Sequence, residues 1–260
     1  MIAALFDSKW FPLVYVLLLG ASIFLGAQIA GRWVMLKTDY EKWLNNNLSG
    51  AVLSFFSLLL AFTLSASAGS NKERTVLIHR HTDAIGALYR KSFLYSDSLR
   101  AGVKRYALEA LALKIQAAQL HGDARRQIDS QSFWHNEHYL KAVSALARQQ
   151  PDAALREETR DITDAVQQII ELDSTIHYSN QERTPLMVML LLLMGSLMTG
   201  FVIGLGKYHF QPRRYIGPFL YLLLSGLTVL TIQDMDNPHT GLVRPPYEIY
   251  RTVWQEINQE

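Results

Sequence analysis

The sequence predicts an all-α integral membrane protein with four transmembrane helices and a helical extramembrane domain inserted between the second and third. Three observations predict this class. Charge is concentrated in residues 72–183, which hold 16 of the 25 basic and 15 of the 23 acidic residues. Four charge-free runs, at 10–31, 43–71, 184–206 and 215–233, are each near or above the roughly 20 residues that cross about 30 Å of hydrocarbon. No alternating run bounded by Asn-Gly or Asp-Gly predicts a strand.

Composition excludes several other classes. The chain contains no cysteine, which rules out a disulfide scaffold. Its net charge of +2 does not provide the concentrated basic face that nucleic acid requires. The first apolar run follows Asp7 and Lys9 rather than a basic cluster and continues to Ala30, so we expect a retained helix and not a cleaved signal peptide.

The first transmembrane hairpin is predicted within residues 1–71. Its first span, at about 11–35, is bounded by Trp10 and Trp33. Indole rings favour the headgroup zone, so these residues fit the two ends of a span. The turn-prone Asn45-Asn-Asn47 separates it from a second span at about 49–68. Because this link is short, we expect the two spans to form a helical hairpin.

Residues 72–183 are predicted to form the extramembrane helical domain. A helix at about 73–95 continues the second span, and two more helices begin near Ser132 and at Pro151. Between the first of these helices and the one near Ser132, a helix from Ser96 to Gly122 has apolar residues at spacings of four, three, four and three. This spacing indicates one packed face. Those apolar residues are Leu99, Val103, Tyr106, Ala110 and Leu113.

The second hairpin is predicted at residues 184–233, with spans at 185–206 and about 216–232. Residues 234–260 form the C-terminal segment, in which Asn237-Pro238 and Gly241 predict a turn. Pro246 then opens an amphipathic helix, which we expect either to lie on the membrane surface or to pack against other helices. Its apolar face holds Tyr250, Val253, Trp254 and Ile257.

The second span carries one stripe of small and hydroxyl side chains, namely Gly50, Ser54, Ser57, Ala61 and Ser65. One interpretation is close packing against another helix. The other is a wet ion path that Phe62 narrows, with Ser54, Ser57 and Ser65 as further pore-lining candidates. Gly200 and Gly204 in the third span predict a packing contact. No Asp, Glu, Lys or Arg lies within the predicted cores of the four spans, which disfavours a proton-coupled transporter.

No motif predicts catalysis, a cofactor or a metal. The chain lacks a Gly-x-Ser-x-Gly elbow, a phosphate-binding glycine loop and a cysteine nucleophile, so we do not expect an enzyme. His135 and His138 are three residues apart on a predicted helix, but no further His or Cys cluster completes a metal site. We expect both to be ordinary surface histidines.

Several motifs resemble those of the bacterial bestrophin-like membrane proteins, a family of unknown function. The matching segments are 58–67 (LLLAFTLSAS), 74–78 (RTVLI), 83–90 (DAIGALYR) and 236–241 (DNPHTG). The order of two spans, a helical insert, two spans and an Asp-x-Pro-x-x-Gly tail covers the whole chain. Where that family often has a glutamate shortly before its Ala-Ile-Gly, this chain has His81.

The resemblance implies remote kinship with bestrophins, which are pentameric anion channels with calcium clasps. Only Asp234 and Asp236 provide acidic side chains directly after the last span, so we do not transfer calcium gating to this chain. We expect a homo-oligomeric, passive ion channel whose partners are lipid, its own copies and ions such as chloride. Arg74 and Arg80 near the mouths give it a weak preference for anions. The alternative is a non-conducting sensor or scaffold whose helical domain binds a partner.

We expect a multi-pass protein of the bacterial inner membrane. Four spans place both termini and the domain on one side and the two short links on the other. The positive-inside rule assigns the links to the cytoplasm, and therefore the domain and termini to the periplasm. The basic residues that favour this orientation are Arg32, Lys37, Lys42, Lys207, Arg213 and Arg214, whereas Lys72, Arg74 and Arg80 favour the opposite.

Overall fold

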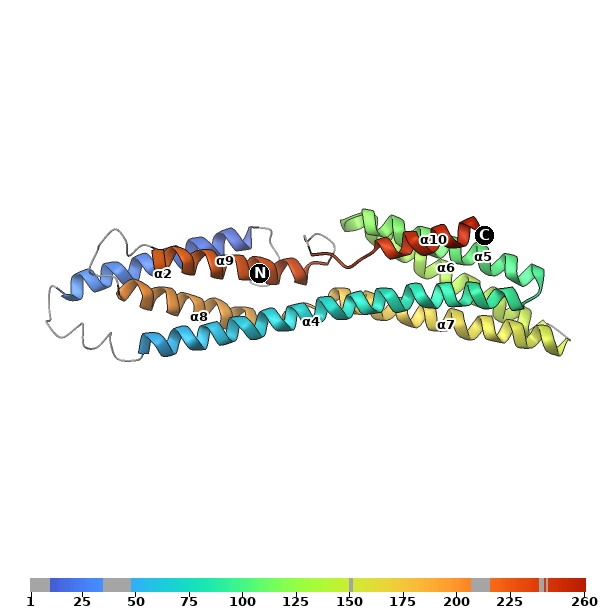
Figure 1. Cartoon of the computed structure of the whole chain (residues 1–260), viewed down its shortest axis with the longest axis horizontal. Coiled ribbons are helices and arrows are strands. Elements are labelled where there is room, and N and C mark those ends of the chain that lie inside the picture. The colour runs from blue at the N-terminus through green and yellow to red at the C-terminus, as the bar shows by residue number, and fades with distance from the viewer. Residues whose placement is uncertain (1–9, 35–47, 150–151, 207–215, 239–240, 242) are drawn as a thin grey trace. The chain divides into compact units, whose positions relative to one another are not determined.

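The computed structural model describes residues 10–34, 48–149, 152–206, 216–238, 241 and 243–260 (Figure 1). These residues form helices and no strand, which confirms the all-α prediction. A 3₁₀ helix, Ser92–Leu94, separates α4 from α5. The α-helices are α2 (Phe11–Val34), α4 (Leu48–Lys91), α5 (Asp97–Gln119), α6 (Gly122–Gln149), α7 (Ala153–Gln181), α8 (Leu186–Leu205), α9 (Ile216–Asp236) and α10 (Glu248–Gln259).

Four helices are long and apolar enough to cross a membrane. They include α2, α4, α8 and α9, so they coincide with the four charge-free runs of the sequence. The predicted number of spans is therefore confirmed as four candidate membrane-spanning helices.

The chain divides into two compact units. Unit 1 comprises residues 1–69 and 183–236, and unit 2 comprises residues 70–182 and 237–260. The uninterrupted helix α4 contributes to both units. The division of the sequence into segments 1–71, 72–183, 184–233 and 234–260 concerned where the membrane part ends, and it stays a prediction.

Unit 1 is held together by the packing of α2 against α8 and α9. Two hydroxyl groups donate to backbone carbonyls between these helices: Ser22 of α2 to Leu197 of α8 at 2.6 Å, and Tyr221 of α9 to Ser196 of α8 at 2.7 Å. The buried apolar side chains of this unit are Phe11, Tyr15, Leu19, Phe56, Met189, Leu192, Val229 and Ile232.

Glycines allow the close approach of α2 to α8. A Cβ atom at Gly204 would collide with the carbonyl oxygen of Ile23, and one at Gly26 would collide with the carbonyl oxygen of Phe201. A Cβ atom at Gly200 would lie 3.4 Å from Ile23 Cγ1. Backbone-to-backbone contact of this kind is typical of small-residue helix packing in membranes. The packing contact predicted from Gly200 and Gly204 is therefore confirmed.

Unit 2 is a helical bundle of α5, α6, α7 and the second part of α4, with α10 packed against α5 (Figure 1). Of the stripe predicted for α5, Val103, Tyr106 and Ala110 are buried, whereas Leu99 and Leu113 are half-buried. Further core residues recur at helical spacing along α4 and α7: Ile78, Ile85, Leu88, Ile162, Val166 and Ile169.

The helix boundaries in unit 2 agree with the sequence at one point and correct it at another. Helix α5 begins at Asp97, as predicted. Helix α6 begins at Gly122 and not near Ser132, so that prediction is wrong. The positive φ of 61° at Gly122 reverses the chain without steric strain. The carboxylate of Asp123 stabilises the first turn of the helix through the positive end of the helix dipole. The polar residues that follow belong to its first turns.

Helix α10 packs inside unit 2. Its Tyr250 and Ile257 are buried, and Val253 and Trp254 are half-buried against the same core. The predicted apolar face is confirmed. Of the two expectations for this helix, the structure shows packing against other helices.

Some predictions fall outside the described residues. They concern the residues before the first span, the two links between spans, the proline start of one helix and part of the C-terminal turn. The residues are Asp7, Lys9, Lys37, Lys42, Asn45, Asn46, Asn47, Lys207, Arg213, Arg214, Pro151, His239 and Thr240.

Candidate functional site

Within unit 1, helix α4 has two different faces. Phe56, Thr63 and Ser67 lie on the inner face, and each is at most 4 % exposed. The small and hydroxyl residues lie on the outer face, where none of the described helices covers them. They are Gly50, Ser54, Ser57, Ala61 and Ser65, all exposed. In the described part of the chain the stripe is therefore available to a neighbouring copy, to lipid or to water.

Phe62 lies on the same outer side of α4 and is 67 % exposed. Other large apolar side chains of unit 1 are equally uncovered, including Leu17 at 64 %, Met187 at 76 % and Leu224 at 62 %. Such extensive apolar exposure is unusual for a surface that faces water. It suits contact with lipid or with another copy of the chain.

The two basic candidates lie in different surroundings in unit 2. Arg74 is 1 % exposed, and its guanidinium donates to the carbonyl oxygens of Ser179 at 3.0 Å and Glu182 at 2.6 Å. A cation at these carbonyls satisfies the C-terminal end of α7. Arg80, by contrast, is exposed. Whether either residue acts on a passing ion stays a prediction.

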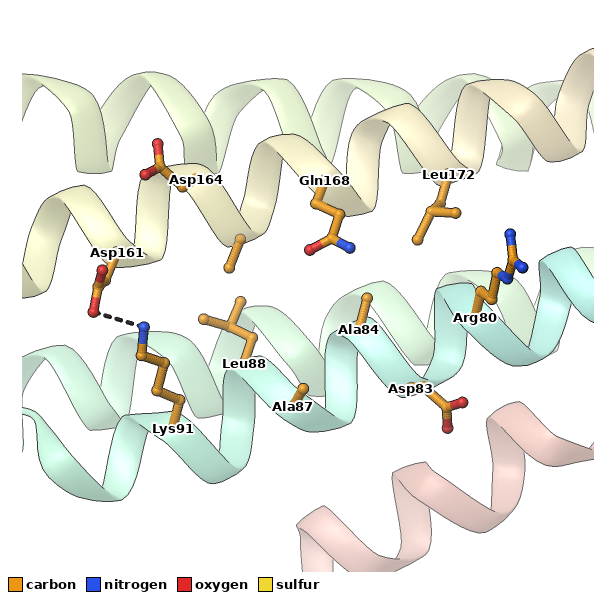
Figure 2. Close-up of a pocket in the computed structure, with 11 residues that line it drawn as sticks. Arg80, Asp83, Ala84, Ala87, Leu88, Lys91, Asp161, Asp164, Gln168 and Leu172 are labelled. Atoms are coloured by element: carbon orange, nitrogen blue, oxygen red, sulfur yellow. Dashed lines mark ion pairs between the residues drawn. The ribbon is translucent and has the colours of Figure 1, made fainter.

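Arg80 lines an open groove between α4 and α7, shown in Figure 2. The groove has a volume of about 780 Å³, with an apolar floor that includes Leu88 and Leu172. Asp83 and Asp164 lie at its edge, and an ion pair of 2.7 Å joins Lys91 to Asp161. Oppositely charged groups above an apolar floor can contact a protein or peptide of mixed charge.

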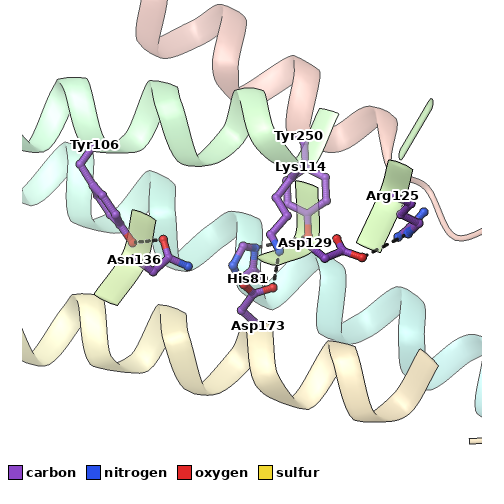
Figure 3. Close-up of polar contacts among 8 residues, drawn as sticks. All are labelled: His81, Tyr106, Lys114, Arg125, Asp129, Asn136, Asp173 and Tyr250. Carbon is purple, nitrogen blue, oxygen red and sulfur yellow. Dashed lines mark hydrogen bonds and ion pairs between the residues drawn. The ribbon is translucent and has the colours of Figure 1, made fainter. Parts of the chain in front are cut away.

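A buried polar cluster lies at the centre of unit 2 (Figure 3). His81 of α4 is 1 % exposed, and its Nδ1 lies 3.3 Å from the hydroxyl oxygen of Tyr250 in α10. Beside it, Lys114 of α5 pairs with Asp173 of α7, with side chains only 13 % and 15 % exposed. Burial lowers the pKa of His81 to about 4, an effect that the nearby Asp173 opposes and Lys114 reinforces. His81 is therefore neutral at neutral pH.

Residues of the motif segment 83–90 pack against α10. Ile85 and Leu88 belong to the same core as Tyr250 and Ile257. Gly86 is buried at this contact, since a Cβ atom there would lie 3.7 Å from a methyl group of Val253. The hydroxyl of Tyr89 donates to the carboxylate of Glu260 at 3.3 Å. These residues of the motif therefore hold the C-terminal helix.

The motif of residues 236–241 begins with a structural residue of unit 1. The carboxylate of Asp236, at the end of α9, accepts a hydrogen bond of 3.2 Å from the backbone amide of Thr184. Thr184 precedes Pro185, the N-cap of α8, so the carboxylate ties the end of α9 to the residue before the start of α8. The contact joins the third and fourth candidate spans.

The histidines of α6 differ from expectation at one position. His138 is exposed, as predicted. His135 is half-buried, and its ring stacks on that of Tyr106 with centroids 5.3 Å apart. The description of His135 as an ordinary surface residue was wrong, because α5 presents an aromatic ring to it. Among the described residues, no group of three His, Asp or Glu side chains is placed to hold a metal ion.

Sequence reasoning missed the central cluster of unit 2. The sequence marks His81 as a departure from the family motif and as a poor metal-ligand pair with His79, which is two residues away, and it does not single out Lys114 or Asp173. The two members of this ion pair are 59 residues apart on different helices. No local spacing rule connects them. The only sequence signal was that each charge interrupts an otherwise apolar helix face.

Comparison with known proteins identifies the fold. No family model matches the chain, and no curated protein matches it. Crystal structures of a bacterial bestrophin homologue from Klebsiella pneumoniae match with TM-scores of 0.63 at 14 % and 15 % identity. The alignments cover 95 % and 97 % of this chain and 97 % and 98 % of the other. A crystal structure described as a membrane protein matches with a TM-score of 0.62 at 14 % identity, over 94 % and 97 %.

The chain therefore has the fold of the bacterial bestrophin homologues over almost its whole length. The resemblance that four short motifs indicated is confirmed at the level of fold.

Proposed function

We propose that this chain is a bestrophin-like, homo-oligomeric membrane protein that conducts ions passively, with a weak preference for anions such as chloride. The observation that carries the proposal is the exposed stripe of α4. Its serines are exposed in the described part of the protomer, yet they lie on an apolar helix that is long enough to span a bilayer. A ring of copies would bring these stripes together around an axis.

The chemistry of the stripe suits a passive route. Hydroxyl groups of Ser54, Ser57 and Ser65 can replace part of the hydration of a passing ion, and Phe62 can form an apolar constriction. Residues 43–71 contain no charged side chain, so α4 provides no carboxylate or ammonium ring within its apolar part. We therefore expect modest selectivity, shifted toward anions by Arg80.

Ion flux into liposomes tests this proposal. The purified protein should raise chloride flux above that of empty liposomes, Phe62→Ala should increase the flux, and Ser57→Leu should reduce it. Leu224→Ala, which shortens an exposed apolar residue of α9, is the matched control and should leave the flux unchanged. Arg80→Glu should lower the ratio of chloride to potassium flux.

Two results would contradict the proposal in different ways. Flux equal to that of empty liposomes at several pH values and calcium concentrations would exclude the channel function. Flux that neither Phe62→Ala nor Ser57→Leu alters would exclude the second span from the ion path while leaving conduction in place.

Self-association is tested separately by native mass measurement in mild detergent. The wild-type chain should form one symmetric homo-oligomer. Ser57→Leu fills the stripe and should shift the mass toward smaller species, whereas Ser57→Ala keeps a small side chain and should not. A monomer at all protein concentrations would contradict the proposal.

We further propose that the central helices form an extramembrane domain in a protein of the bacterial inner membrane. The positive-inside rule favours a periplasmic domain and periplasmic termini. Because the chain has no cysteine, single cysteines at Ser98 and Thr38 can be labelled in whole cells with an impermeant maleimide. Labelling at position 98 alone supports this orientation, and labelling at position 38 alone reverses it.

The groove of unit 2 supports a second candidate function. A non-conducting sensor or scaffold would use a surface such as this one, with its apolar floor and charged edge, to bind a partner protein. An intact oligomer that conducts nothing would favour this alternative. In neither case do we propose an enzymatic activity.

A further inference from the structure

The side chain of Tyr250 in α10 packs against His81 of α4. The rings of His81 and Tyr250 meet edge to face, with centroids 5.7 Å apart and planes at 77°. Tyr250 is 2 % exposed, so its ring and the His81 ring exclude water from one another. The Nε2 atom of His81 is also buried and has no hydrogen-bond partner in the described part of the chain. This imidazole is therefore held in a closed, poorly hydrated site.

Burial opposes a second proton on this imidazole, and of the charged groups around it Lys114 also opposes that proton whereas Asp173 favours it. Lys114 approaches from α5, Asp173 from α7 and Tyr250 from α10, while Arg125 of α6 acts on Tyr250 (Figure 3). Asp173 is the carboxylate near His81, and it already pairs with Lys114. An imidazolium would share that carboxylate with an ammonium group and would lose its hydration.

We propose that α10 is a proton-controlled latch, in which protonation of His81 releases the C-terminal helix from α4 and α5. The proposal goes beyond ion conduction and does not depend on it, because it rests on contacts within unit 2. Release of α10 would remove Tyr250 and let water reach the imidazole. The charged histidine then keeps its hydration, so protons favour the released state over the docked state.

The pH range follows from linkage. In the released state His81 titrates near its ordinary pKa of about 6.5, whereas in the docked state burial lowers this pKa to about 4. Between these values the released state binds more protons, so docking weakens as the pH falls. These two values predict that the released population rises about tenfold between pH 7.5 and pH 5.5.

Thiol accessibility in the full-length, detergent-solubilised protein measures this population. A cysteine at Ile257, which is 2 % exposed on the inner face of α10, reacts only when the helix is released. A cysteine at the exposed neighbour Asn258 gives the reference rate at each pH. The ratio of the two rates reports small released populations when opening is fast relative to labelling. A pyridyl disulfide reagent is suitable because it reacts in acid.

The variants test whether His81 is the group that makes the labelling ratio depend on pH. The ratio of the labelling rates at positions 257 and 258 should rise about tenfold from pH 7.5 to 5.5 when His81 is present. It should change less than about twofold when His81→Gln is added. His79→Gln is the matched control, since His79 is an exposed histidine on the same helix, and it should keep the full rise. Tyr250→Phe removes the hydroxyl and should raise the ratio about fivefold at every pH while retaining the pH dependence.

Three results would overturn the proposal. The first is a ratio that stays constant with pH in the parent protein. The second is an equal rise in His81→Gln. The third is a parallel rise at a cysteine replacing the buried Val103 of α5, because this would indicate unfolding of the whole bundle and not release of α10. If His81→Gln does not fold, His81→Leu takes its place and should likewise change the ratio less than about twofold, whereas an equal rise would overturn the proposal.

Discussion

The two units of this chain bury different chemistry. In unit 1, α2 meets α8 through glycines at which the backbones touch, and large apolar side chains remain on the outside. In unit 2, aliphatic and aromatic side chains face inward and surround a buried histidine and ion pair. Each arrangement suits a different solvent. Lipid tails provide no hydrophobic drive between helices, so close backbone packing replaces it, whereas water drives apolar faces together.

This difference also determines where each unit can tolerate change. Unit 1 depends on the absence of side-chain atoms at a few positions, and its hydroxyl stripe is exposed among the described residues. Unit 2 depends on charges that are neutralised in pairs away from water. Substitutions that add volume should therefore damage unit 1, and changes in protonation or charge should damage unit 2. Three predictions test this contrast, from the largest expected effect to the smallest.

The largest effect is expected at Gly204. Leucine at this position would place side-chain atoms against the backbone of Ile23 and force α2 away from α8. We expect a loss of about 3 kcal/mol or more in the stability of unit 1, at the upper end for overpacking. Gly20→Leu is the control, because no atom lies within 4 Å of the Cβ position at Gly20. Thermal unfolding in detergent should separate the two variants, and equal melting temperatures would refute the packing argument.

An intermediate effect is expected at Lys114. Lys114→Met leaves the Asp173 carboxylate, only 15 % exposed, without its cation and should lower the stability of unit 2 by about 3 kcal/mol. Lys91→Met breaks an ion pair whose side chains are 48 % and 41 % exposed, and it should lower the stability of unit 2 much less, because solvent screens exposed pairs. Chemical denaturation followed by circular dichroism measures both. Combining Lys114→Met with Asp173→Leu should recover most of the loss, and a larger loss in the double variant would contradict this account.

The smallest effect is expected from mild acid. The pKa of His81 is about 4 in the folded protein and about 6.5 when unfolded, so the unfolded state binds more protons between these values. Stability should therefore fall as the pH falls, by about 1.4 kcal/mol from pH 7.5 to pH 5.5. The difference between the parent protein and His81→Gln isolates this contribution from other titrations. Amide exchange, corrected for its intrinsic pH dependence, should localise the loss in unit 2.

Length, charge distribution and helical spacing were sufficient to predict four apolar helices, an all-α fold and a charged helical segment between the second and third. These properties are local, because about 20 uncharged residues must form a helix if they are to lie in hydrocarbon. The packing of the glycine pair of α8 could also be predicted, because the spacing of Gly200 and Gly204 is a local property of one helix. The bestrophin-like fold was indicated by short motifs that keep their order along the chain.

Contacts between distant residues required the tertiary structure. The sequence shows a stripe of serines on α4, but only the packed helices show that this stripe faces outward in the protomer. It shows His81 as a departure from a motif, but not that Tyr250, 169 residues later, covers it. The physical reason is that burial and pairing depend on which helix faces come together. That choice is made by the sum of many weak contacts, which no single spacing in the sequence records.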